Sequence, residues 1–261
     1  TSVRVRVRRR PAVRLYRGWR FASFLDGAAA VRLLAQSGEV PTVLRLSDEA
    51  ETAINLARPS EVGAQAPGGC LLIAGYEGDR RTVDRIHVST GDRLRGLGGE
   101  SLGHAPGAGW AQGRFHGPYL RDSLLDAGVL VETLETATFW SNLTRLYADV
   151  RAALETSLAD QGTPPIVLCH ISHVYETGAS LYFTVVARQT DEPLGQWGTA
   201  KAAASDAIVA AGATITHHHA VGRDHRPWFA EEVGPVGVEV LRAVKARLDP
   251  EGVLNPGVMV P

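Results

Sequence analysis

Apolar positions along this chain follow two different periods. Short stretches dense in branched apolar residues, bounded by Gly or Pro, predict buried strands. They are residues 41–46, 69–78, 128–140, 164–175 and 179–189. The last two are joined through Glu176, Thr177 and Gly178, a turn-like break that predicts an antiparallel hairpin.

Longer segments between these strands carry helix-forming residues and helix end signals. Residues 26–38 are rich in Ala and Leu, and residues 197–212 end in a glycine, as helices commonly do. A helix that opens at Ser141 would carry an apolar stripe for packing on a sheet. That stripe consists of Leu143, Leu146, Tyr147, Val150 and Leu154. Further helices are predicted over residues 47–57, from about residue 81, and over 228–248, the last with a stripe of Val233, Val240, Leu241, Val244 and Leu248.

Strands interleaved with helices, with at least one antiparallel pair, indicate an α+β fold more than a doubly wound parallel one. We therefore expect an antiparallel or mixed sheet with helices packed on one face, followed by a C-terminal helical segment. Residues 96–117 are rich in glycine and are predicted to form a loop.

The N-terminal segment alternates Val3, Val5 and Val7 with arginines. Two interpretations fit this pattern: a strand with one solvent-exposed face, or a basic arm that binds nucleic acid. The period of two favours the strand.

Composition narrows the classes of protein. The 261 residues carry 27 basic and 28 acidic side chains, so no global field favours nucleic acid, and we expect no such partner. Only Cys70 and Cys169 are present, too few for a disulfide framework, which predicts a reducing, cytoplasmic location. No apolar run approaches the ~20 residues that a membrane-spanning helix needs.

Three adjacent histidines, His217, His218 and His219, precede a glycine turn. On a regular strand the middle ring would face away from the other two, so the three could not chelate one metal. No acidic or cysteine partner stands at a metal-ligand spacing, and we expect no metal site. The histidines are then either a functional cluster or solvent-facing and satisfied core residues, and the triplet favours function.

Three further side chains are candidate catalytic or ligand-binding residues. Tyr182 lies in an apolar strand, where a tyrosine alone is more typical of core packing. Arg45 in VLRL and Arg121 in YLRD each need an anion, either a ligand such as phosphate or a buried aspartate. The sequence has no GxGxxG or Walker-type loop, and therefore no self-sufficient cradle for a nucleotide phosphate.

Six segments in order connect these residues to a known family. They are VLRLSDEAE, LLIAGYEGD, YLRDSLLDAG, HISHVYETGASLYF, HHHAVGRDHRPW and LDPEGVLNPG. Over nearly the whole chain, this combination resembles the C-terminal part of alkyldihydroxyacetonephosphate synthases, within the vanillyl-alcohol-oxidase-type flavoproteins. The LDPxGxLNPG ending is general to that superfamily, whereas the histidine triplet and the LYF strand point to the synthases.

The resemblance implies a ferredoxin-like α+β cap over the ring of an FAD cofactor. Residues 1–15 would be a remnant strand of the FAD-binding domain, 16–216 the substrate-binding cap, and 217–261 a segment returning to the flavin site. The missing N-terminal FAD-binding half is then an expected partner. The resemblance also implies a lipid substrate, and it brings peripheral membrane association and a homodimer into consideration.

The same resemblance implies roles for individual residues. FAD would hold C1 of acyl-dihydroxyacetone phosphate covalently, without redox change, while a fatty alcohol replaces the fatty acid. Tyr182 matches the tyrosine that handles the C1 proton, and His218 and His219 match the histidines that line the reacting centre.

The remaining matched residues concern binding. Arg121 matches the arginine that holds the substrate phosphate, and Arg45 matches a second active-site arginine. His217 and Asn255 are assigned to the cofactor. Two alternatives remain: a redox FAD enzyme that oxidises an alcohol or a 2-hydroxy acid, and a cap module that binds a ligand or partner without catalysis.

Overall fold

One antiparallel sheet organises the computed structural model, which describes residues 2–7, 9–54 and 68–260. Within these residues seven strands pair in the order β4-β1-β3-β2-β6-β7-β5, and every neighbouring pair is antiparallel. The strands are β1 Val13–Phe21, β2 Val43–Ser47, β3 Cys70–Gly78, β4 Glu100–Gly103, β5 Val129–Phe139, β6 Ile166–Val174 and β7 Gly178–Arg188. The predicted α+β class is confirmed.

The predicted hairpin is the pair β6–β7, and β5 lies on the other side of β7. The β5–β7 ladder runs without a break from Val129 opposite Arg188 to Phe139 opposite Gly178. A Cβ atom at Gly178 would lie 2.1 Å from the carbonyl oxygen of Thr138. Only glycine therefore fits where the hairpin turn meets β5.

The main hydrophobic core lies between one face of the sheet and a layer of four helices. These are α1 Phe24–Ala35, α3 Arg80–Gly96, α6 Leu143–Asp160 and α7 Pro193–Ala210. The predicted stripe of α6 is confirmed, because Leu146, Val150 and Leu154 are fully buried. The short helix α2 Glu49–Ala53 follows β2 and is capped by Asp48, whereas predicted helical residues 55–57 lie outside the described residues.

The opposite face of the sheet carries two more helices, α4 Ala105–Gly113 and α5 Gly117–Asp126. Trp110 of α4 packs on Leu71 and Ile73 of β3. The prediction of a loop over residues 96–117 was therefore wrong. Packing decides the outcome there, since Gly107 lies so close to the β1 backbone that a Cβ would meet it at 2.8 Å.

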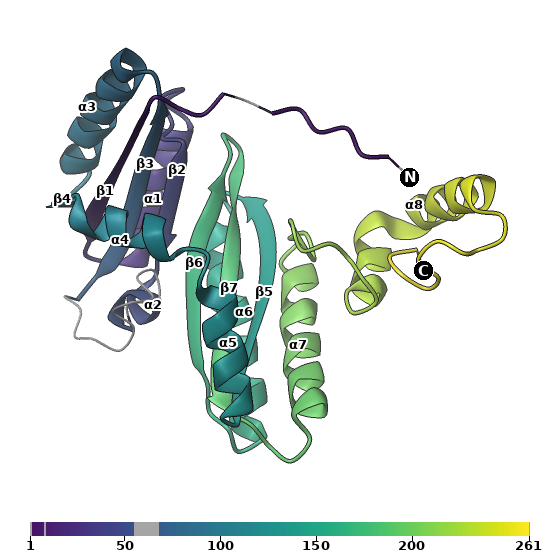
Figure 1. The fold of residues 1–261 in the computed structure, drawn as a ribbon. Helices are drawn as coiled ribbons and strands as arrows, with labels where there is room; N and C mark the ends of the chain where they lie inside the picture. The colour runs from purple at the N-terminus through teal and green to yellow at the C-terminus, as the bar shows by residue number, and fades with distance from the viewer. Residues whose placement is uncertain (1, 8, 55–67, 261) are drawn as a thin grey trace.

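The C-terminal helix α8 Arg226–Leu248 is placed apart from the sheet and contacts α7 (Figure 1). It is kinked at Gly234, whose φ is 68°, immediately before Pro235. Most of its predicted apolar stripe is exposed rather than packed, with Val240 57% and Leu248 74% exposed. The tail after α8 returns to residues 222–226, where the Met259 N–H donates to the Gly222 carbonyl.

The N-terminal segment differs from its prediction. Residues 2–7 and 9–12 form no strand, and Val3, Val5 and Val7 are exposed. A strand needs a neighbour for its backbone N–H and C=O groups, and no described strand pairs with this segment. The first strand is instead the aromatic-rich β1. No helix among the described residues is long and apolar enough to cross a membrane.

Candidate active site

A cavity of about 1060 Å³ opens on the face of the sheet that α4 and α5 cover. Its wall follows the alternation of strand side chains. On β7, Leu181 and Phe183 enter the main core, whereas Tyr182 and Thr184 line the cavity. Arg45 of β2, His170 of β6 and Arg121 of α5 line the same space.

Strand register brings polar residues of three strands into one row across the sheet. Glu135 of β5 stands opposite Tyr182 of β7, and Tyr182 stands opposite His170 of β6. The rings of Tyr182 and His170 are stacked, with centroids 4.9 Å apart and planes 16° apart. His170 in turn faces Ser47 at the end of β2. The row therefore places a carboxylate, a phenol and an imidazole within neighbouring positions.

The guanidinium of Arg45 forms a buried ion pair at one end of this row. Its Nη2 donates to Glu51 Oε1 at 2.8 Å, its Nη1 donates to Ser47 Oγ at 2.9 Å, and His170 Nδ1 lies 3.0 Å from both Nη2 and Oε1. The Glu51 side chain is 0% exposed. Of the two partners expected for Arg45, a buried carboxylate is present, and it is a glutamate rather than an aspartate.

Burial and charge shift the pKa values of this group in a consistent direction. Desolvation alone would raise the pKa of Glu51, but the charge of Arg45 and the contact with His170 outweigh it, so the pKa is lowered. The pKa of His170 is lowered by desolvation and by Arg45, against the opposing effect of Glu51. The pair is thus an arginine cation and a glutamate anion beside a neutral imidazole.

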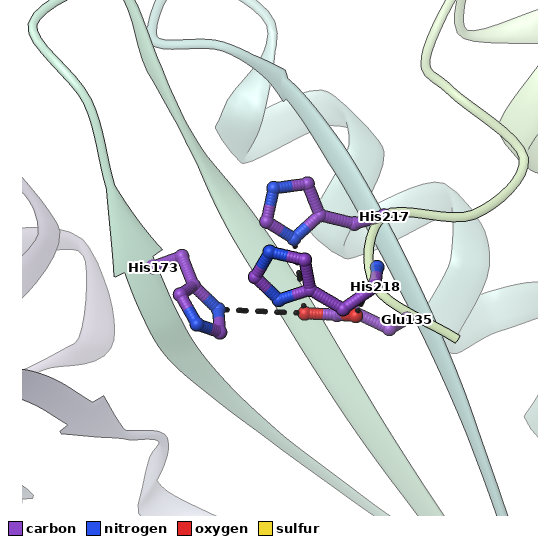
Figure 2. A group of neighbouring side chains, drawn as sticks. All are labelled: Glu135, His173, His217 and His218. Carbon is purple, nitrogen blue, oxygen red and sulfur yellow. Dashed lines mark hydrogen bonds and ion pairs between the residues drawn. The ribbon is translucent and has the colours of Figure 1, made fainter. Parts of the chain in front are cut away.

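The histidine triplet lies at the other end of the row, in an irregular segment between α7 and α8. Glu135 fixes this segment to the sheet: its Oε2 accepts from the His218 backbone N–H at 2.9 Å, and its Oε1 lies 3.2 Å from His217 Nδ1 (Figure 2). The ring of His219 lies edge-on to Tyr182, with centroids 5.2 Å apart.

The environment of Glu135 keeps this carboxyl ionised. Burial raises its pKa, but the hydrogen bonds from His218 and His217 and the neighbouring imidazole charges outweigh burial and lower it. The pKa of His173, which lies 3.6 Å from the same Oε1, is lowered by desolvation and by His218. The expectation that strand geometry separates the histidines was wrong, because residues 217–219 form no strand.

The other two predicted binding residues lie in different places. Arg121 lines the cavity, and its Nη2 donates to Glu132 Oε1 at 2.7 Å. Asn255 lies exposed in the C-terminal tail with a φ of 46°, and it is not among the residues that line the cavity. The structure therefore brings Tyr182, Arg45 and Arg121 around one cavity, with the histidine triplet beside Tyr182 and Asn255 outside it.

Four residues of this site were missed by the sequence reasoning: Glu51, Glu135, His170 and His173. A signal existed for Glu135, since a charged residue within an apolar strand needs a partner, as was argued for Arg45. His170 lies on the same apolar strand as His173, in the segment HISHVY. The contacts of Glu51 with His170 and of Glu135 with His217 span 119 and 82 residues, so no local pattern identifies them. Glu51 lies only 6 residues from Arg45, and this short spacing was a local signal for the pair.

The comparisons with known proteins fit this geometry. The family described as FAD linked oxidases, C-terminal domain, matches residues 10–259, and the chain belongs to this family. It is similar to the alkyldihydroxyacetonephosphate synthase of Dictyostelium discoideum, with 32% identity over 94% of this chain and 44% of that protein. The synthase of Trypanosoma brucei brucei is 27% identical over 100% of this chain and 46% of its own length.

A solved structure of an alkyldihydroxyacetonephosphate synthase superposes with a TM-score of 0.75 and 29% identity, covering 95% of this chain and 45% of that one. The chain thus spans about half the length of the curated relatives that it matches. The resemblance to the synthases is confirmed.

The buried pair Arg45–Glu51 predicts a specific dependence of stability on pH. The folded-state pKa of Glu51 lies below its ordinary value of 4.5, so the unfolded chain takes up this proton first as the pH falls. The stabilisation is complete above pH 4.5 and is lost as the pH falls through the folded-state value of about 2. In urea unfolding measured over this range, Glu51→Gln should show a smaller loss of unfolding free energy than the wild type.

Two controls isolate the effect. Asp48 acts in the opposite sense, because burial raises its pKa to about 6 and its protonation in the folded state favours folding as the pH falls. Because the charge of Glu51 is one cause of this raised pKa, the comparison is repeated in an Asp48→Asn background, in which residue 48 does not titrate. The exposed Glu231→Gln variant should follow the wild-type curve. An identical pH profile for Glu51→Gln and the wild type would show that Glu51 is not held ionised by Arg45.

Proposed function

We propose that this chain is the substrate-binding and proton-handling half of an FAD-dependent alkyldihydroxyacetonephosphate synthase-like enzyme. The observation that carries the proposal is the wall of the cavity. Tyr182 stands between His170 and His219, with Arg45 and Arg121 lining the same space. A phenol among imidazoles and guanidiniums suits the handling of a proton next to an anionic substrate.

The cavity suits a substrate with a charged head and an apolar chain. Its polar wall contains the side chains described above, and most of the rest is apolar. The apolar part includes Leu120, Leu124, Val131, Leu168 and Val186. A guanidinium has five N–H donors. The hydrogen bond from Arg121 to Glu132 uses one of them, and Asp122 Oδ1 lies 3.6 Å from Arg121 Nη1. We infer that Arg121 holds a phosphate and that Arg45, tied to Glu51, provides fixed positive charge.

The residues present fit the ring of FAD and not its phosphates. The exposed imidazole of His219, edge-on to Tyr182, offers a donor or an acceptor for the ring heteroatoms, and the exposed His218 precedes it in the chain. The sequence contains no glycine-rich phosphate loop, so the pyrophosphate must be held by the other half of the enzyme. Bound FAD would supply the reactive ring nitrogen beside the substrate carbon. We assign His217 and Asn255 to the cofactor-facing side as part of the same proposal.

The exposed surface of helix α8 supports the proposal that a separate FAD-binding half packs against this chain. Its apolar side chains Val236, Val240, Val244 and Leu248 are exposed by 51–74%, and Val253 and Leu254 continue the apolar surface. Such a surface along one helix is typical of a covered interface. We infer that the FAD-binding half packs here, which would bring residues 217–261 back to the flavin site.

The proposed reaction is tested with the complete flavoprotein that contains this chain. We expect it to form an ether lipid from acyl-dihydroxyacetone phosphate and a long-chain alcohol, at the same rate with and without an electron acceptor. Product is measured by mass spectrometry of the lipid extract. Turnover that requires an electron acceptor and yields no ether would contradict the proposal and would identify a redox flavoenzyme.

Tyr182 should be essential for turnover and not for folding. We expect Tyr182→Phe to lower kcat by about 10²–10⁴-fold, the range that a positioned acid or base contributes, while flavin absorbance per chain stays at the wild-type level. The control is Tyr119→Phe, which removes a hydroxyl from a tyrosine that is 75% exposed on α5 and should leave kcat unchanged. Wild-type turnover by Tyr182→Phe would refute the role of this residue.

A further inference from the structure

Four side chains with metal-ligating atoms converge beside the cavity. They are Glu135 of β5, His173 of β6, and His217 and His218 of the segment before α8 (Figure 2). One ligand atom from each lies within 4.8 Å of the ligand atoms of the other three. The four residues come from three segments that are far apart in the sequence, so the fold itself creates the cluster.

We propose that this cluster binds one divalent transition-metal ion of the zinc type. Three imidazoles and one carboxylate are the ligands that zinc prefers, whereas Mg²⁺ and Ca²⁺ prefer sets of oxygen atoms. Four protein ligands would close the coordination shell, as in structural zinc sites. The inference goes beyond the proposed synthase function and does not depend on it.

The ligand atoms need to move only a little to reach the separations of a tetrahedral zinc site. Zinc bonds of about 2.0–2.1 Å in a tetrahedron place the ligand atoms about 3.4 Å apart. Glu135 Oε1 already lies 3.2 Å from His217 Nδ1 and 3.6 Å from His173 Nδ1. The ring centroid of His218 lies 4.0 Å from that of His217 and 4.2 Å from that of His173. His173 and His218 are exposed, and their rings can turn toward the carboxylate without disturbing the core.

Surrounding groups hold the cluster in place, as expected of a metal site. The Tyr175 hydroxyl lies 2.9 Å from His217 Nε2, which orients that ring with Nδ1 toward Glu135. The His218 backbone N–H engages Glu135 Oε2 and leaves Oε1 directed at the two imidazoles. Glu135 is 3% exposed, so its negative charge requires a nearby cation.

The same contacts could also exist with protons alone, as hydrogen bonds that fix residues 217–218 to the sheet. Metal titration separates these two states. The purified chain is stripped with a chelator and titrated with Zn²⁺ in the presence of a weak competing chelator, and bound zinc is counted by elemental analysis after dialysis. We expect one zinc per chain and a rise in Tm on loading, since a ligand that binds only the folded state stabilises it.

Matched variants locate the site. His173→Gln and His218→Gln should each lower zinc affinity by at least about 10-fold, since even residues behind the ligands affect affinity by about 10–100-fold. Glu135→Gln should do the same. His219→Gln removes the third histidine of the triplet, which is outside the cluster, and should retain wild-type zinc affinity. His104→Gln, an exposed histidine before α4, is a second control.

The outcomes are distinguishable even if one variant folds poorly. Because His173 and His218 are exposed, their metal-free variants should melt at the wild-type temperature, and they carry the test if Glu135→Gln is unstable. No zinc retained by the wild type, or equal losses for His219→Gln and His218→Gln, would overturn the proposal. Neither result would affect the synthase proposal, because no step of this experiment measures turnover.

Discussion

The register of three antiparallel strands is the constraint on which the site depends. Pairing of β5 with β7 and of β7 with β6 places Glu135, Tyr182 and His170 in one row on one face of the sheet. A slip by one residue would turn Tyr182 into the hydrophobic core and Phe183 into the cavity. The core residues on the opposite face therefore fix the register, and through it the position of the phenol.

Two buried carboxylates at the ends of this row fix groups that the backbone hydrogen bonds of the sheet do not hold. Glu51 holds the guanidinium of Arg45 and touches His170, while Glu135 holds the backbone and ring of the histidine segment. Burying a carboxylate is costly unless charges and hydrogen bonds compensate it, so each of these carboxylates restricts its partners to few positions. The side chains around the cavity are thus set in place before a ligand arrives, which is what catalysis by positioning would require.

Local patterns predicted the parts of the fold that local physics determines. The β6–β7 hairpin, helix α6 and its buried stripe follow from period and end signals, and all are present. Helix α4 was not predicted, because its glycine-rich sequence becomes helical only through packing against β1 and β3. The N-terminal segment shows the opposite case, a strand-like pattern without a strand to pair with.

In the candidate site, too, some residues could be predicted from the local sequence and others could not. Tyr182, Arg45, Arg121 and the histidine triplet were identified from the residues and a family resemblance, and the structure gathers them around or beside one cavity. Their partners Glu51 and Glu135 were not identified. The contacts of Glu135 with His217 and of Glu51 with His170 span 82 and 119 residues and exist only after the sheet has formed, whereas Glu51 lies only 6 residues from Arg45 and was overlooked. The stripe of α8 was predicted from its period, but its exposure was not, since period alone does not say which surface covers a helix.

The central claim is that this one cavity receives the substrate with its reacting carbon at Tyr182. The most direct measurement is a crystal structure of the complete flavoprotein with a non-reactive analogue of acyl-dihydroxyacetone phosphate. The account predicts the phosphate at Arg121, the apolar chain between β5 and α5, and the flavin ring on the side of His218 and His219. An analogue bound elsewhere, with Tyr182 in contact with neither ligand nor flavin, would contradict it.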